Sequence, residues 1–463
     1  MFKTLLQKEI NEIIRTKKFL ISFVFCSILI LLTFYVGANS YFVNKYQYDA
    51  AVDENLRAMK GITDWRMINH KIFLPPRPLA YLVSGISNDI GRNISIKGRG
   101  EITPEDSKYN EDPIYAAFRF LDLNFLFQVI LSLFAILLTY NAVNGEKELG
   151  TLRLIFSNSV PRDKYILAKI SGSFIAITIP LLIPFLLGSL ILVITGVPMG
   201  SSEWLKLGLI IFTGFTFYGT FLTLSVFVST ITAKSSNSFL FLLVAWVVMI
   251  LIIPRASVLI AGNSVDVPSV DEINSKKSAY AIQTMDETIT KMNSFQPENM
   301  DNLMNEFGEF MDKIDAEREE KLNSYYEKLE QERFNMQKVQ ADLSFLISRV
   351  SPASTFQFAV TAIAGTSLEL INSYKEQAKE YQKVYANFEI EKTGGASSSG
   401  IVMIVEGPEE KEINPAELPK FKFSSPTFAN VLSGSIIDIG LLLIFNLLFF
   451  AGSIVSFIKF DLR

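Results

Sequence analysis

Cysteine and histidine are almost absent from this sequence, with one of each among 463 residues, Cys26 and His70. A single cysteine excludes a disulfide within the chain, and a single histidine excludes HExxH-type and multi-histidine metal sites. The chain also lacks a GxxxxGK[ST] phosphate-binding loop and a GxSxG nucleophile elbow. Nothing in the sequence therefore supports catalysis by this chain, and we expect it to bind no metal or cofactor of its own.

Charged residues are also scarce, at 19% of the chain, where soluble proteins carry about 25%. The net charge of −4 argues against a nucleic-acid partner. Hydrophobic residues make up 49% and gather in six runs near bilayer length, roughly 20 residues. The runs lie at residues 19–36, 123–140, 170–195, 205–230, 239–260 and 436–458. The sequence predicts an all-α polytopic membrane protein with six transmembrane helices.

The orientation follows from the lysines and arginines. They are frequent in residues 1–18 and in residues 141–169, and the short loop 196–204 has none. Because cytoplasmic loops are enriched in these residues, we expect both termini and the 141–169 segment in the cytoplasm. The first run could instead be a cleaved signal peptide, since Val36 and Ala38 suit cleavage. Its 18 residues exceed a typical signal-peptide core, so we expect it to remain as a span.

Residues 1–18 have helical periodicity. Apolar residues recur there at a spacing of three to four, at Phe2, Leu5, Leu6, Ile10, Ile13 and Ile14. One apolar helix face with charges elsewhere predicts an interfacial amphipathic helix. The alternative is a short positive leader to the first span.

Two long polar insertions, 37–122 and 262–435, are expected outside the membrane as a mainly helical extracytoplasmic domain with minor β structure. A strand is predicted at residues 401–405. In the second insertion, apolar residues follow a 3-4-3 spacing at Ile282, Met285, Ile289 and Met292. This pattern resumes after Pro297 and predicts a helical hairpin or small bundle packed through those residues. Residues 262–340 hold 17 acidic and 9 basic residues, which indicate a solvated helix surface or a docking surface for exported cargo.

A Ser-Pro start at Ser351-Pro352 and a stop at Gly365-Thr366 predict a short amphipathic helix between them. Two placements remain open for it. The helix could lie flat on the outer leaflet, or it could pack under the outer domain.

Residues 141–169, which we call the elbow, combine charges with helix signals directly after an apolar run. An apolar face is predicted from Leu149, Leu152, Ile155 and Phe156, with Glu146 and Lys147 largely off it. Gly150 is expected to allow close approach of another backbone. Pro161 ends this helix, and Arg162 begins the next one. The simplest interpretation is a re-entry loop bearing positive charges.

The elbow also resembles a known segment. Its resemblance is to the coupling segment of type 2 ABC-exporter permeases, with Ala168 where that family usually has Gly. The matching residues are Glu146, Lys147, Glu148, Leu149, Gly150, Thr151, Leu152, Ser157, Pro161, Arg162 and Lys169. The six-span layout, the interfacial helix and the paired prolines of the third run are similar to that family. The segment from Ser351 to Thr366 resembles the subgroup with a large insertion between spans five and six, which includes nitrous-oxide-reductase maturation permeases.

The resemblance implies a permease subunit in the bacterial inner (plasma) membrane that pairs with a second permease chain, identical or related. A separate cytoplasmic ATPase subunit, carrying ATP and Mg, would bind the elbow. Glu146, Glu148 and Arg162 would make polar contacts, and Leu149 and Leu152 would supply the buried face. A periplasmic partner is possible for the outer insertions.

Two other hypotheses remain. A non-transport scaffold or receptor would use the outer helical domain to bind a periplasmic or cell-surface partner and would need no ATPase. A membrane-embedded enzyme would need a polar cluster between the spans, and the near absence of charges in the runs argues against it.

Overall fold

The computed structural model describes residues 2–87, 90–96, 104–105, 121–157, 160–296, 303–393 and 413–459. Six of its helical stretches are long and apolar enough to cross a membrane. They are Lys17–Arg57, Leu123–Glu148, Arg162–Ile194, Ser201–Ile231, Ser235–Ser264 and Phe428–Lys459. The part of the chain that the structure describes is mainly helical, with three short strands, so the predicted all-α polytopic class is confirmed.

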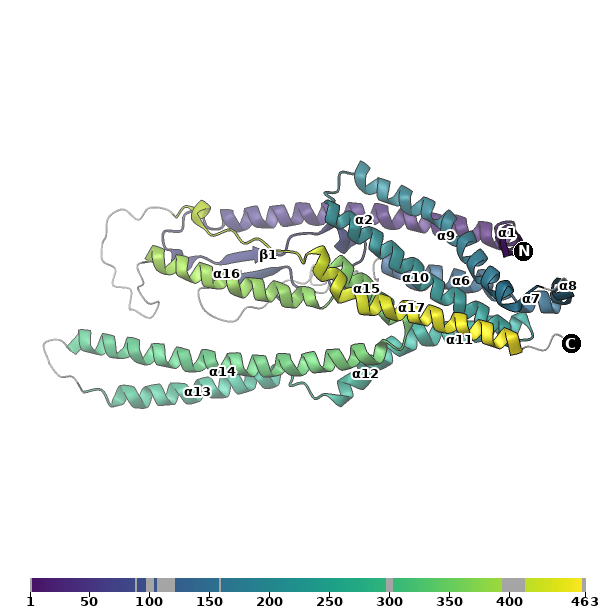
Figure 1. Ribbon diagram of the computed structural model, residues 1–463. Coiled ribbons are helices and arrows are strands. Elements are labelled where there is room, and N and C mark those ends of the chain that lie inside the picture. Colours follow the sequence, from purple (N-terminus) through teal and green to yellow (C-terminus); the bar gives the residue numbers. More distant parts are fainter. Residues whose placement is uncertain are drawn as a thin grey trace.

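The spans form one bundle (Figure 1), with both termini at one end and the insertions projecting from the other. Spans one, three, four and six are the single helices α2 (Lys17–Arg57), α9 (Arg162–Ile194), α10 (Ser201–Ile231) and α17 (Phe428–Lys459). The second span joins α5 (Leu123–Phe125), the π-helical segment η3 (Leu126–Leu131) and α6 (Ser132–Thr139). The fifth joins α11 (Ser235–Val247), the π-helical segment η4 (Val248–Ile252) and α12 (Ile253–Ser264).

Helix α10 lies at the centre of the bundle, where most of its apolar window is buried. Aromatic rings from several elements surround it. Phe127 stacks on Phe185 with ring centroids 5.2 Å apart, and Phe217 stacks on Phe356 at 4.6 Å. Such pairs contribute about 0.5–1.5 kcal/mol each beyond the area they bury. The aromatic cluster therefore ties spans two, three and four to the helix that carries Phe356.

That helix, α15 (Pro352–Ala364), begins and ends as the sequence predicts. The Ser351 hydroxyl accepts the Ala353 N–H at its start, and Gly365 takes a left-handed conformation at its end. Ten of its thirteen residues are buried, so α15 packs inside the bundle against α10, α17 and η4. It does not lie flat on the outer leaflet, because other helices cover most of its residues. Its carboxyl end meets the first insertion, where Arg77 donates to the Gly365 carbonyl at 2.8 Å and the Ile86 N–H donates to the Thr366 carbonyl at 2.9 Å.

Helix α15 is fastened to both π-helical segments. Gln128 in η3 donates a hydrogen bond from Nε2 to the Ala353 carbonyl at 3.2 Å. The Ser351 hydroxyl donates to the Met249 carbonyl in η4. The two irregular turns therefore lie where α15 meets spans two and five.

The first and second insertions share one outer core, which was not predicted from the sequence. Strands β1 (His70–Phe73), β2 (Asn93–Ile96) and β3 (Pro104–Glu105) form an antiparallel sheet in the order β1-β2-β3. Helix α16 (Glu369–Thr393) from the second insertion packs with this sheet, and its Tyr374 hydroxyl lies 3.1 Å from the carbonyls of Ile72 and Arg92. The predicted strand at 401–405 lies outside the described residues.

The rest of the second insertion is the predicted hairpin, α13 (Val270–Asn293) and α14 (Leu303–Ser348). It extends beside the outer core (Figure 1). Its packing differs from the prediction, because Ile282, Met285, Ile289 and Met292 are exposed. After α14, Arg349 forms a two-pronged ion pair with Asp438 of α17, at 2.7 and 3.2 Å. The ion pair attaches the base of the hairpin to span six.

Candidate functional site

The elbow is two short helices rather than one. Helix α7 (Asn144–Glu148) ends at Leu149, and α8 (Thr151–Ser157) begins after Gly150. Gly150 has a φ of 72°, a left-handed conformation that costs a residue with a side chain roughly 1–2 kcal/mol. The chain turns at this glycine, so α7 and α8 present different faces.

The predicted single apolar face is absent, because Leu149 is 79% exposed while Leu152 is 3% exposed. Among the described residues of this chain, apart from its chain neighbours, no atom lies within 4 Å of a Cβ placed on Gly150, so within the chain this glycine serves the turn. The close approach of another backbone to Gly150 stays a prediction. Leu152 packs in the bundle core with Ile155 and Phe156 beside it, and Leu149 points away from that core.

A buried ion cluster lies behind the elbow. The Glu146 carboxylate is 3.0 Å from the Lys169 Nζ, and it accepts a hydrogen bond from the Tyr165 hydroxyl at 2.6 Å. The same Lys169 Nζ lies 2.6 Å from a carboxylate oxygen of Glu9. Lys8 reaches Glu146 from the outside at 3.1 Å. Glu9, Glu146 and Lys169 are 5–6% exposed, so the cluster is sealed from solvent.

Glu9 brings the amino-terminal helix α1 (Phe2–Ile14) into the site. This helix packs against α9, and a Cβ on Gly172 would touch the Glu9 side chain at 2.8 Å. The sequence held one signal for it. Glu9 falls between Leu5 and Ile13 at four-residue spacing, on the face expected to be apolar. A carboxylate there needs a buried cation as its partner.

Lys147 and Glu148 fasten the elbow to spans four and five. The Lys147 Nζ donates to the Thr230 carbonyl at the end of α10, at 2.7 Å. Glu148 accepts from the backbone N–H and the hydroxyl of Ser235 at 2.9 and 2.8 Å, which caps the start of α11. Asn144, which was not singled out in the sequence, lies 2.9 Å from the Thr232 hydroxyl through its Nδ2.

Pro161 and Arg162 make the corresponding contacts at spans three and six. Pro161 precedes α9, and the Arg162 guanidinium donates to the Ile458 carbonyl near the end of α17 at 2.6 Å. A cation at a helix C-terminus satisfies a free carbonyl and opposes the helix dipole. Beside it, the rings of Phe156, Tyr165 and Phe457 pack with centroids 5.2–5.7 Å apart.

The structure thus divides the predicted site residues into two groups. Five of them, Glu146, Lys147, Glu148, Arg162 and Lys169, bond to other elements of this chain, and Thr151 bonds to the Glu146 carbonyl at 3.3 Å. Leu149 and Gly150 lie on the exposed side, where Leu154 joins them at 68% exposure. Leu154 was not predicted from the sequence as a site residue. One side of the elbow is therefore bonded to the spans, and its other side exposes two leucines, Leu149 and Leu154.

Six apolar spans, two insertions at one end and a braced elbow at the other define a polytopic helical membrane protein. Its sequence matches the family model described as ABC-2 family transporter protein over residues 3–462, so the chain belongs to that family. A member of this family is the membrane component of an ABC transporter and is not itself catalytic. A search of curated proteins found no match to the sequence.

Proposed function

We propose that the chain is the permease subunit of an ATP-driven ABC exporter in the bacterial inner membrane. It acts in a pair of permease chains, and separate cytoplasmic ATPase subunits bind ATP and Mg and drive it through the elbow. Family membership supports a transporter component. The absence of a phosphate-binding loop from the sequence supports an energy source on another chain.

One observation supports the coupling role. One side of the elbow is bonded to the spans, and its other side exposes apolar side chains. Leu149 and Leu154 are 79% and 68% exposed beside the charged Arg153. Burying two such side chains in a partner's groove contributes roughly 1.5–3 kcal/mol each. Leu149 therefore keeps its proposed place at the ATPase interface, joined by Leu154. The contacts of Leu152, Glu146 and Arg162 lie within this chain and not at the ATPase interface.

The contacts behind the elbow form a contiguous route for a push on its front. Glu148 would move the start of α11, and Lys147 would move the end of α10. Arg162 would move the end of α17, and the Glu146–Lys169–Glu9 cluster would carry α9 and α1 together. Displacement of the elbow would thus reach spans three to six and the amino-terminal helix at once.

The orientation in this proposal follows from the lysine and arginine distribution. The elbow, α1 and both termini face the cytoplasm, and the outer core and hairpin face the other side, where a periplasmic partner could bind them. A cysteine at Ser324, an exposed residue of α14, should react with an impermeant thiol reagent added outside. Labelling only after the membrane is ruptured would invert the orientation.

The finer likeness to the nitrous-oxide-reductase maturation subgroup stays a prediction. Its support is the helix bounded by Ser351-Pro352 and Gly365, which the structure contains as α15. The position of α15 among spans two, four, five and six favours a role at the outer end of the transport path.

The test of the proposal is co-purification with an ATPase subunit. Leu149→Asp combined with Leu154→Asp should weaken the association at least about tenfold, since two buried leucines are replaced by charges. Lys164→Asp is the control, because Lys164 is exposed at the start of α9, outside α7 and α8, and its substitution should retain the ATPase. Glu146→Arg would not serve this purpose, because Glu146 is buried against Lys169. If the unaltered chain purifies without any ATPase, the scaffold hypothesis replaces this one.

A further inference from the structure

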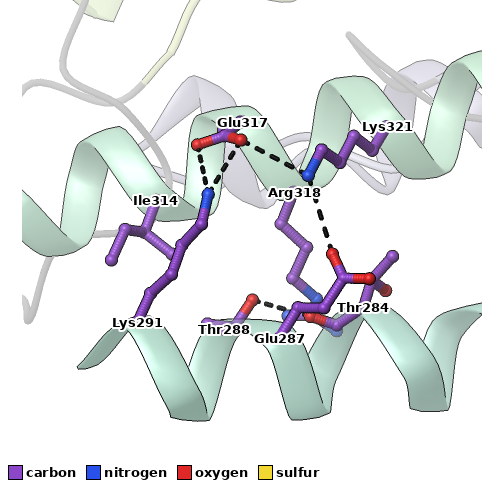
Figure 2. A pocket seen from close by; sticks show the side chains of 8 residues that line it. All are labelled: Thr284, Glu287, Thr288, Lys291, Ile314, Glu317, Arg318 and Lys321. Atoms are coloured by element: carbon purple, nitrogen blue, oxygen red, sulfur yellow. Dashed lines mark hydrogen bonds and ion pairs between the residues drawn. The ribbon is translucent and has the colours of Figure 1, made fainter. Parts of the chain in front are cut away.

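Helix α13 has a polar inner face where it meets α14. Figure 2 shows this seam, where Thr284 and Thr288 lie among charged side chains from both helices. Lys291 pairs with Glu317 at 2.7 Å, and Lys321 lies 3.6 Å from Glu287. At this level the ion pairs and the buried Ile314 hold α13 against α14, while Thr284 and Thr288 donate their hydroxyls to carbonyls of α13 itself.

The apolar residues of the same stretch lie on a different side of α13. Ile282, Met285, Ile289 and Met292, which we call the α13 stripe, are 65%, 44%, 41% and 37% exposed. At 100° per residue the four share one side of the helix, turned away from Thr284 and Lys291. At this level α13 buries polar residues and exposes apolar ones. An exposed apolar patch marks an interaction site, so we expect a partner to cover the α13 stripe.

Lipid does not cover the stripe. Asp271, Glu272, Lys276 and Lys277 lie between the end of span five and the first stripe residue. From Val270 to Ile282 the helix rises by about 18 Å, at roughly 1.5 Å per residue. The hairpin continues away from the bundle (Figure 1), so the stripe lies well beyond the spans.

We propose that the α13 stripe pairs with the same stripe of a second copy of this chain, as a short parallel two-stranded coiled coil. The 3-4-3 spacing is that of a coiled-coil seam, with Ile282 and Ile289 at the a positions and Met285 and Met292 at the d positions. β-Branched residues at a favour two strands. This inference rests on the proposed permease pair and names its second member as an identical chain.

Membrane topology and the flanking charges both favour a second copy of this chain as the partner of the α13 stripe. Two copies cross the membrane in the same direction, so a two-fold axis along the membrane normal brings the same residues together in parallel. Parallel pairing places Ala281 opposite Asp286 at the flanking g and e positions, while the other g position, Thr288, lies against α14. No like charges meet across the seam. A helix with this self-complementary pattern suits an identical partner.

The stripe also continues an uncovered edge of the bundle. Span five is the least buried of the six, with 11% of its apolar window covered against 72% for span four. In Figure 1, α11, α12 and α13 follow one another along the same edge of the molecule. An interface between copies that begins at span five would lead outward to α13.

Disulfide trapping in native membranes tests the pairing. The background is Cys26→Ala, which removes the one cysteine of the chain. Ile289→Cys and Met285→Cys should give a dimer-sized adduct under mild oxidation, since equivalent seam positions meet across a two-fold axis. Thr290→Cys, exposed and next in sequence but off the seam, should give several-fold less. Differently tagged copies expressed together should appear in one adduct.

Three outcomes overturn the proposal. They are equal adducts at residues 289 and 290, no adduct at either seam position, and an adduct to a different polypeptide. The oligomeric state of the unoxidised protein, measured in nanodiscs, separates this failure from that of the proposed function. A dimer without a seam adduct overturns only the α13 pairing, whereas a monomer also contradicts the permease pair.

Discussion

Lys169 is the residue on which three segments of the chain depend. Its ammonium group lies between Glu9 of α1 and Glu146 of α7, which are 137 residues apart in sequence. Removing one partner of a buried ion pair leaves an uncompensated charge, which costs more than the intact pair contributes. The sequence indicated that Lys169 belongs to the elbow, but it could not show Glu9 as its partner. Helix periodicity describes neighbours along one helix and not contacts between distant ones.

Lys169→Met should therefore destabilise the protein strongly. Two carboxylates, Glu9 and Glu146, would remain buried without their shared cation, at a cost of about 3–5 kcal/mol. Thermal unfolding of the purified protein in detergent would measure the loss. Lys276→Met is the control, because its pair with Glu272 is exposed on α13 and contributes only about 0–1 kcal/mol. Equal unfolding temperatures for the two variants would contradict the assignment of Lys169 as the central cation.

At the scale of elements, the six apolar runs lie in six long helices, as expected because a bilayer demands long apolar runs whatever their partners are. Hydropathy could not show whether an apolar stripe on a helix is buried or exposed. The spacing of Ile282 and Ile289 on α13 correctly indicated a helix, but those residues face away from α14. The elbow shows the same limit. The sequence placed Leu149 and Leu152 on one helix face, but the positive φ of Gly150 breaks the helix and separates the exposed Leu149 from the buried Leu152.

The pairing of β1 with α16 predicts a pH dependence of the outer core. His70 of β1 is buried, and its Nε2 lies 2.9 Å from the Tyr381 hydroxyl, which itself donates to the Pro419 carbonyl at 2.6 Å. Burial lowers the pKa of His70 to about 4. The fold therefore holds the neutral ring, while the unfolded chain takes up a proton near pH 6.5. Stability should be full above that pH and fall as the pH drops toward 4, by on the order of 3 kcal/mol.

Fluorescence of Trp65, which packs against Phe388 in the outer core, can follow this transition. Trp204 and Trp246 would be replaced by Phe so that one reporter remains. His70→Gln retains a side-chain N–H donor and does not titrate, so it should flatten the profile between pH 6.5 and 4. A profile unchanged by that substitution would assign the acid sensitivity to other groups.

The whole molecule links a braced elbow at one end to a projecting outer region at the other. Charge asymmetry and family membership support a cytoplasmic elbow and a transporter role. The outer core could not be predicted, because its sheet comes from the first insertion and its helix α16 from the second. Residues far apart in sequence meet there, and the composition of either insertion alone does not reveal it.

The most direct measurement of the coupling claim is photo-crosslinking from position 149 in native membranes. A photoreactive amino acid there replaces an exposed leucine and so preserves the buried contacts of Glu146 and Leu152. The account predicts a covalent adduct with a cytoplasmic ATPase subunit that contains a GxxxxGK[ST] loop. The same probe at position 339, an exposed residue of α14, should not capture that subunit. An adduct from position 149 only to proteins without ATPase motifs, or the ATPase captured from position 339 instead, would contradict it.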